Sequence, residues 1–212
     1  MEELDLLKKA WQKDTHSLEQ VSEVEIYKML HKKSSSIVKW ILIISILEIV
    51  LWSAIGIVFN TDDAIKSLHA EDLLIYLKIL NYANYIVIAG FIYCFYKNYT
   101  KISTINSTKQ LMNDILRTRK TVRNYVWYNL SMIFVCTLLG FAMAFVYNPD
   151  MSIIKDKIAN DDSNMILIKI ILILVLTLVV LVGIFWLFYR LLYGILLRKL
   201  YANYKELKKI DL

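Results

Sequence analysis

The sequence predicts an all-α, polytopic membrane protein in which four transmembrane helices form two hairpins. Four apolar runs are the first indication: residues 37–59, 73–96, 125–147 and 165–189. Each run has at least 23 residues, and a helix needs about 20 to cross the roughly 30 Å hydrocarbon core of a bilayer. The second indication is composition. Because 58% of the residues are hydrophobic and only one is proline, we expect long, unbroken helices.

The distribution of basic residues predicts which side of the membrane each segment faces. Segments 1–39, 97–124 and 190–212 contain 20 of the 25 Lys and Arg residues. The connectors 60–72 and 148–164 are acidic, with four Asp or Glu in each. Lys and Arg in short loops remain cytoplasmic, so we expect both termini and the loop 97–124 on the cytoplasmic side. The net charge of +6 is then a topology signal and does not favour direct nucleic-acid binding.

The apolar runs divide the chain into three parts. Residues 1–36 form a cytoplasmic N-terminal helical segment, residues 37–189 the four-helix transmembrane domain with its cytoplasmic loop 97–124, and residues 190–212 a cytoplasmic helical tail. The first run starts too late and is too long for a cleavable signal peptide, so we expect an uncleaved anchor. Apolar residues continue at helical spacing through the loop and the tail. We therefore expect helical extensions on the cytoplasmic side, the last one reaching about Lys209.

The N-terminal segment contains the candidate partner-binding residues. Five apolar side chains at helical spacing are candidates: Leu4, Leu7, Trp11, Tyr27 and Leu30. Ser22 and Glu25 are spaced as a capping box, which predicts that a second helix begins there and continues into the first crossing. The short first helix either lies on the membrane or docks on a protein. Its acidic residues Glu2, Glu3 and Asp5 fit anionic lipid poorly, so we favour docking on a partner or on the chain itself.

Glu48 lies deep within the first predicted crossing, about 16 Å from its start at Ile37. A charged side chain at such a depth is costly, and it is usually functional or paired. Polar residues of the other crossings fall at a similar depth, which predicts an intramembrane polar layer: Glu48, Asn84, Thr137 and Thr177. We expect Glu48 to be protonated, to face the bundle interior and to bond Asn84 or Thr177. A proton or cation relay is the alternative, although a single acidic residue is weak support for a transport function.

Cysteines and histidines do not form a recognisable reactive or metal-binding pattern. Cys94 and Cys136 lie about 14 Å apart in depth, whereas the Cα atoms of a disulfide lie within about 7 Å, so we expect two small, buried packing residues. His16, His31 and His69 lack ligand spacing. Gly-rich phosphate loops, Ser/His/Asp sets and CxxC motifs are also missing from the sequence. We therefore expect no metal, no cofactor and no enzyme activity.

Two N-terminal stretches carry a resemblance to a known group of proteins. They are Glu3–Trp11 (ELDLLKKAW) and Val21–Ser36 (VSEVEIYKMLHKKSSS). They resemble small four-helix inner-membrane proteins of Bacteroidota, which are often encoded beside extracytoplasmic-function sigma factors and are sometimes labelled carotenoid oxygenases. The resemblance implies a bacterial inner membrane and an anti-sigma-like role. The oxygenase label conflicts with the sequence, because those enzymes hold iron with four His and this chain has three. The His and Cys pattern of zinc anti-sigma proteins is missing as well.

Three functions remain in order of preference. The first is a non-enzymatic inner-membrane protein that binds a cytosolic partner through its N-terminal and other cytoplasmic helices, with a sigma factor as the partner that the resemblance implies. The second is an accessory or assembly subunit of a larger membrane complex. The third is a small transporter that uses Glu48. The lipid bilayer is the other expected partner, and a homo-oligomer is left open.

Overall fold

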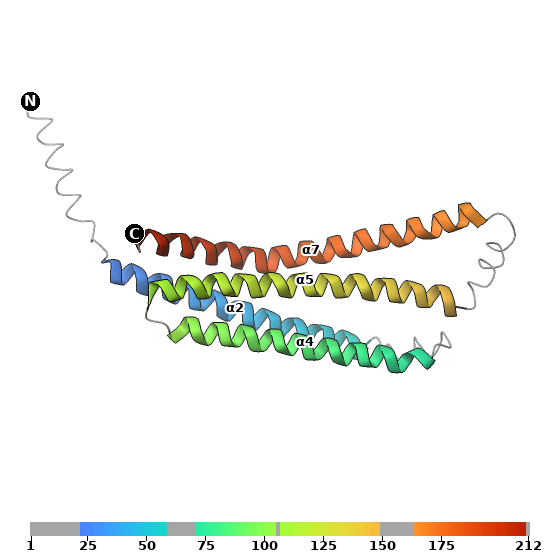
Figure 1. The fold of residues 1–212 in the computed structure, drawn as a ribbon, viewed down its shortest axis with the longest axis horizontal. Coiled ribbons are helices and arrows are strands. Elements are labelled where there is room, and N and C mark those ends of the chain that lie inside the picture. Colours follow the sequence, from blue (N-terminus) through green and yellow to red (C-terminus); the bar gives the residue numbers. More distant parts are fainter. Residues whose placement is uncertain (1–21, 59–70, 105–106, 149–162, 211–212) are drawn as a thin grey trace, which may run out of the picture.

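The chain folds into four long helices, as the apolar runs predict. The computed structural model describes residues 22–58, 71–104, 107–148 and 163–210. Within them lie α2 (Glu23–Val58), α4 (Glu71–Thr104), α5 (Thr108–Tyr147) and α7 (Ser163–Ile210). Figure 1 shows them as one elongated bundle in which consecutive helices run in opposite directions. All four are long and apolar enough to cross a membrane, so the all-α, four-helix prediction is confirmed.

The helices form a four-cornered bundle. α2 packs against α4 and α7, α5 packs against the same two helices, and α2 and α5 lie diagonally with few contacts. Each hairpin, α2 with α4 and α5 with α7, is therefore a pair of antiparallel helices that pack against each other. The single helix from Ser163 to Ile210 confirms the expected helical tail.

The start of α2 has the predicted capping box. The backbone N–H of Glu25 donates to Ser22 Oγ at 3.3 Å, and the backbone N–H of Ser22 donates to Glu25 Oε2 at 3.2 Å. These two bonds satisfy backbone donors that a helix start otherwise leaves free. The helix then continues without a break into the first apolar run.

The buried core lies toward the end of the bundle where α2 and α5 begin, on the left of Figure 1. We call the outermost cluster the stalk core: Leu30, Val38, Ile102, Leu111, Ile115, Leu200 and Leu207. Three hydrogen bonds tie neighbouring helices there: Asn98 Nδ2 to Thr121 Oγ1 at 3.4 Å, Asn203 Nδ2 to Ser34 Oγ at 3.1 Å, and His31 Nε2 with the Ile102 carbonyl at 2.5 Å. This end of the molecule is packed like a water-soluble helical bundle.

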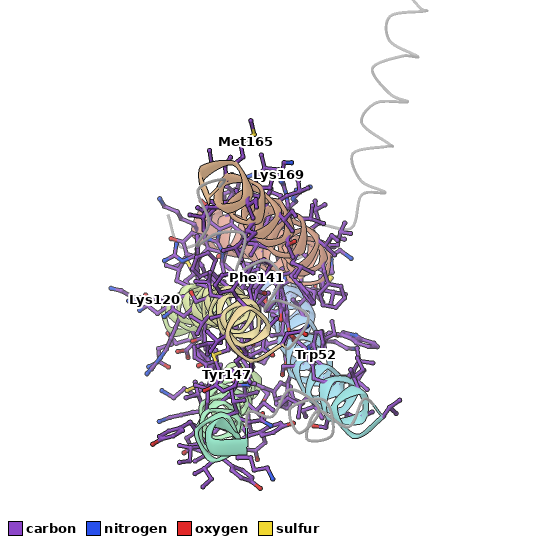
Figure 2. All side chains as sticks on the ribbon, turned by 90° about the vertical axis from the view of Figure 1, so that its right-hand side faces the viewer. Trp52, Lys120, Phe141, Tyr147, Met165 and Lys169 are labelled. Atoms are coloured by element: carbon purple, nitrogen blue, oxygen red, sulfur yellow. The ribbon has the colours of Figure 1, made fainter. Side chains whose placement is uncertain are left out.

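The opposite end of the bundle is open. α7 leans away from α5 toward its beginning in Figure 1. In Figure 2, which faces this end, Met165 of α7, Tyr147 of α5 and Trp52 of α2 lie well apart. The most apolar stretch of α4 contains no buried residue. Apolar side chains here therefore face outward rather than one another.

The prediction that both cysteines are buried packing residues is wrong. Cys94 and Cys136 are exposed on the outside of the bundle, and both are free thiols. The reason is the apolar character of the outer surface, which resembles a core in its composition. A small apolar side chain inside such a run can therefore face either way.

Candidate functional site

Glu48 is the centre of the candidate site. It lies on the inner face of α2, where Ile41, Ser45 and Glu48 recur at helical spacing and are all buried. The Glu48 side chain is only 6% exposed, so its expected orientation toward the bundle interior is observed. The neighbouring Ser45 hydroxyl bonds the Leu42 carbonyl of its own helix at 2.8 Å. The Ser45 hydroxyl proton is therefore used within α2 rather than donated to the carboxyl group.

Three tyrosine hydroxyls hold the Glu48 carboxyl group. Tyr125 of α5 donates to Oε2 at 2.8 Å, and Tyr193 of α7 donates to the same oxygen at 3.2 Å. Tyr189, one turn earlier on α7, donates to Oε1. A buried polar group is costly unless it is hydrogen-bonded, and three phenols meet that need for the carboxyl. We call Glu48 and these three side chains the tyrosine lock, because together they connect α2, α5 and α7.

Aromatic rings hold the three hydroxyls in position. The Tyr125 ring meets Phe91, Phe95 and Tyr193 edge to face, with centroids 5.4, 5.5 and 5.9 Å apart. The Tyr189 ring stacks on Tyr193 at 6.1 Å. Offset and edge-to-face pairs are favourable arrangements of aromatic rings, and they restrict the rotamers of the tyrosines. The lock is therefore preorganised by its own hydrophobic shell.

The chemistry of the lock is that of a structural tie. Within the described part of the chain, its carboxyl group is bonded by hydroxyl groups rather than by a Lys or Arg. Phenols both donate and accept, so these contacts fit either protonation state, and a protonated Glu48 stays a prediction. Among the described residues, no group of three His, Cys, Asp or Glu side chains could hold a metal ion.

The expected polar layer does not assemble around Glu48. Asn84 accepts a bond from the Tyr128 hydroxyl at 2.9 Å instead. Thr137 and Thr177 each donate at 2.8 Å to the carbonyl four residues earlier in their own helix. Thr side chains readily satisfy their hydroxyls in this way inside helices. The prediction that Asn84 or Thr177 bonds Glu48 is therefore wrong, and tyrosines take that place.

The level of Glu48 along the bundle also differs from the prediction. Its partner Tyr125 begins the third predicted crossing, Tyr189 ends the fourth, and Tyr193 lies beyond it. Glu48 is thus level with the basic ends of these two runs rather than with their middles. The physical reason is the stalk core: Val38 and other early apolar residues of α2 are buried against protein. Apolarity in that part of the run reflects packing, so counting from Ile37 does not give the level of Glu48 relative to the other three runs.

Comparison with known protein families assigns the chain to one family. A family model described as "Domain of unknown function (DUF8845)" matches residues 24–212. The chain belongs to this family. Neither the curated proteins nor the solved structures contain a significant match. The DUF8845 region begins at the start of α2 and contains the whole tyrosine lock, so the lock lies within the family's domain.

The predicted partner-binding residues divide into two groups. Leu4, Leu7 and Trp11 lie outside the described residues and precede the DUF8845 region. Leu30 is 4% exposed and belongs to the stalk core, and Tyr27 is partly buried against that core. The prediction that Leu30 contacts a partner is therefore wrong, because its side chain already fills the space between helices. Helical spacing alone marks an apolar face without saying what covers it.

Proposed function

We propose that this chain is a non-enzymatic bacterial inner-membrane protein that crosses the membrane four times and holds a protein partner on the cytoplasmic side. The observation that carries the proposal is the stalk core, which packs the predicted cytoplasmic extensions of all four helices into one bundle. The N-terminal face of Leu4, Leu7 and Trp11 would supply the docking helix.

Six of the seven stalk-core residues lie outside the predicted crossings, and Val38 lies at the start of the first one. Leu111 and Ile115 belong to the loop 97–124, and Leu200 and Leu207 belong to the tail; all four are fully buried. Leu207 lies about 27 Å beyond Tyr189 along α7. Burial of apolar surface from water is the main source of stability for such a core. A protein that only had to cross the bilayer would need no packed stalk of this length, so the stalk favours a task in the cytoplasm.

The tyrosine lock is better evidence for a scaffold function than for a transport function. Its carboxyl group is tied to α5 and α7 by three hydroxyls, and this geometry stiffens the bundle where the stalk core meets the apolar ends. A relay would instead need successive titratable groups along a path. Transport predicts a flux that depends on Glu48, and a scaffold does not.

A mild-detergent pull-down of the full chain, followed by mass spectrometry, tests the proposal. The expected result is recovery of a soluble cytosolic protein, and a sigma factor is the partner that the resemblance implies. A triple variant of Leu4, Leu7 and Trp11 to Ala should lose that protein and still insert. Undiminished recovery by the triple variant would overturn the proposed docking helix.

A second candidate, an accessory subunit of a larger membrane complex, is favoured by the exposed apolar face of α4. Ile75, Ile79 and Ile86 are all largely exposed on that helix. Changing these three residues to Ala provides the matched control for the pull-down. The accessory-subunit candidate predicts that this variant loses co-purifying membrane proteins, whereas the leading proposal predicts that it keeps the soluble partner.

A further inference from the structure

Two adjoining hollows form a groove between α5 and α7. One has a volume of about 430 Å³ and the other about 570 Å³. Trp127 of α5 and Trp186 of α7 line both hollows, so the two are continuous. We call them together the α5/α7 groove. In Figure 2, Lys120, which lines the first hollow, projects from the opposite side of the bundle to Trp52 of α2.

The first hollow is basic. Its cations are Arg119, Lys120, Arg123 and Arg190, and no acidic side chain lines it in the described part of the chain. Two guanidinium groups are fixed on aromatic rings: Arg119 lies 4.2 Å above Tyr201, and Arg190 lies 4.9 Å above Trp186. Stacking on a ring face leaves the N–H groups in the guanidinium plane free to bind an anion.

Arg119 supplies a second, independent sign of a missing ligand. Its Nε atom is buried and has no hydrogen-bond partner among the described residues. A buried donor without an acceptor is unfavourable, and Arg119 is one of the residues that line the groove. Arginine presents its N–H groups as a planar fork that suits phosphate oxygens.

The second hollow is apolar. Its lining is dominated by aliphatic and aromatic side chains, among them Leu130, Phe134, Leu178, Val179 and Val182. Along both helices a cation is followed by a tryptophan in the direction away from the stalk core. Moving away from the stalk, α5 presents Arg123 and then Trp127, and antiparallel α7 presents Arg190 and then Trp186. The two tryptophans are 66% and 46% exposed, as expected of side chains at the level of lipid headgroups.

We propose that the α5/α7 groove is a binding site for one anionic phospholipid. The phosphate lies among the four cations, and an acyl chain occupies the apolar hollow beyond the two tryptophans. A basic pocket between membrane helices on the cytoplasmic side is a typical headgroup site. A soluble phosphate would leave the apolar hollow empty, and the cationic headgroup of a zwitterionic lipid would be repelled by the four cations. The inference rests on the membrane location proposed above, but not on the protein partner.

The groove is joined to the tyrosine lock. Tyr189 and Tyr193 line the basic hollow and also donate to Glu48. A lipid that binds the folded bundle and not the unfolded chain stabilises the bundle by mass action. Anionic lipid should therefore raise the Tm of the delipidated protein, and it should do so through the same cations that bind the headgroup.

Native mass spectrometry and thermal unfolding of the delipidated full chain test the site. The probes are phosphatidylglycerol, phosphatidylcholine with the same acyl chains, and glycerol 3-phosphate. We expect phosphatidylglycerol alone to bind tightly and to raise the Tm. Changing Arg119, Arg123 and Arg190 together to Gln should weaken that binding by roughly fivefold for each cation removed. A control triple variant at Lys109, Arg117 and Arg198, exposed cations outside the groove, should bind like the parent.

A second pair of variants tests the apolar hollow without touching any charge. Gly183 lines it, and an added Cβ there meets no atom within 4 Å. Gly183→Phe should fill the hollow and reduce phosphatidylglycerol binding, whereas Gly140→Phe, at an equally open glycine outside the groove, should not. Equal binding of both lipids would overturn the proposal, as would glycerol 3-phosphate binding as tightly as the lipid. So would equal losses in a groove variant and its control, or unchanged binding by Gly183→Phe.

Discussion

The hydroxyl of Tyr125 donates a 2.8 Å hydrogen bond to Oε2 of Glu48 and thereby joins α5 to α2, two helices that lie diagonally and otherwise touch little. Tyr193 adds α7 at the same oxygen, at 3.2 Å. One carboxyl group therefore sets the spacing of three helices at a single level of the bundle. That level is where the packed stalk gives way to the open apolar end.

Removing the carboxyl group should destabilise the bundle. Glu48→Leu leaves three buried tyrosine hydroxyls without their acceptor, and each stranded group costs about 1–3 kcal/mol. Glu48→Gln keeps the shape and one carbonyl oxygen that can still accept, so its loss should be much smaller. Thermal unfolding followed by circular dichroism in detergent should rank Tm as parent, then Gln, then Leu. Glu206→Leu, at an exposed acid of α7, is the control and should unfold like the parent.

The same series separates a structural tie from proton coupling. If Glu48→Gln folds like the parent but loses the activity or the partner of the protein, the carboxyl group has a role besides packing. If Glu48→Leu unfolds at the same Tm as the parent, the lock does not stabilise the bundle.

A double-mutant cycle should detect the bond between Tyr125 and Glu48 directly. Tyr125→Phe and Glu48→Leu remove opposite ends of one interaction, so their effects on the free energy of unfolding should be non-additive by about 0.5–3 kcal/mol. Tyr128→Phe provides the control, because the Tyr128 hydroxyl bonds Asn84. The cycle of Tyr128 with Glu48 should be additive, and equal coupling in both cycles would contradict the assignment of the bond.

Sequence reasoning predicted the helices well because their signals are local. The capping box at Ser22 and Glu25 and the apolar periodicity of the loop and tail require no knowledge of neighbours, and α2 and α7 follow them. The orientation of Glu48 toward the interior was also predictable, since a lone acid in an apolar run avoids lipid.

The partners of Glu48 were not predictable by the same route. Tyr125, Tyr189 and Tyr193 lie at or beyond the ends of apolar runs, where tyrosine is expected as an interface residue in any case. The four-residue spacing of Tyr189 and Tyr193 was the available signal, because it places both on one face of α7. Their meeting with Glu48 depends on the axial register of α2 against α5 and α7. That register depends on packing between helices, including the stalk core, and long-range packing of this kind leaves no trace in local periodicity.

Leu30 should act as a core residue rather than a contact residue. Leu30→Ala creates a cavity in the stalk core, and such changes typically cost about 2–5 kcal/mol. Val24→Ala, at an exposed position six residues earlier on the same helix, should change the stability of the protein little. Chemical unfolding in detergent compares the two variants. Equal and small effects would contradict the burial of Leu30, and loss of the protein partner without loss of stability would restore Leu30 as a contact residue.

The proposed topology predicts a specific pattern of cysteine labelling. A cysteine-free variant can serve as the starting protein. Cys94 and Cys136 are exposed and unpaired, so changing both to Ala should leave the packing intact. Single cysteines then replace Asp62, Asp156 or Lys109. A membrane-impermeant maleimide should label the first two from outside intact cells, because these acidic connectors are the segments that the distribution of Lys and Arg assigns to the far side. Lys109→Cys should be labelled only after permeabilisation, since it lies at the start of α5 in the basic segment 97–124.

The reverse pattern would invert the bundle and place the stalk core outside the cytoplasm. Labelling of all three from one side would show that the helices do not cross as pairs.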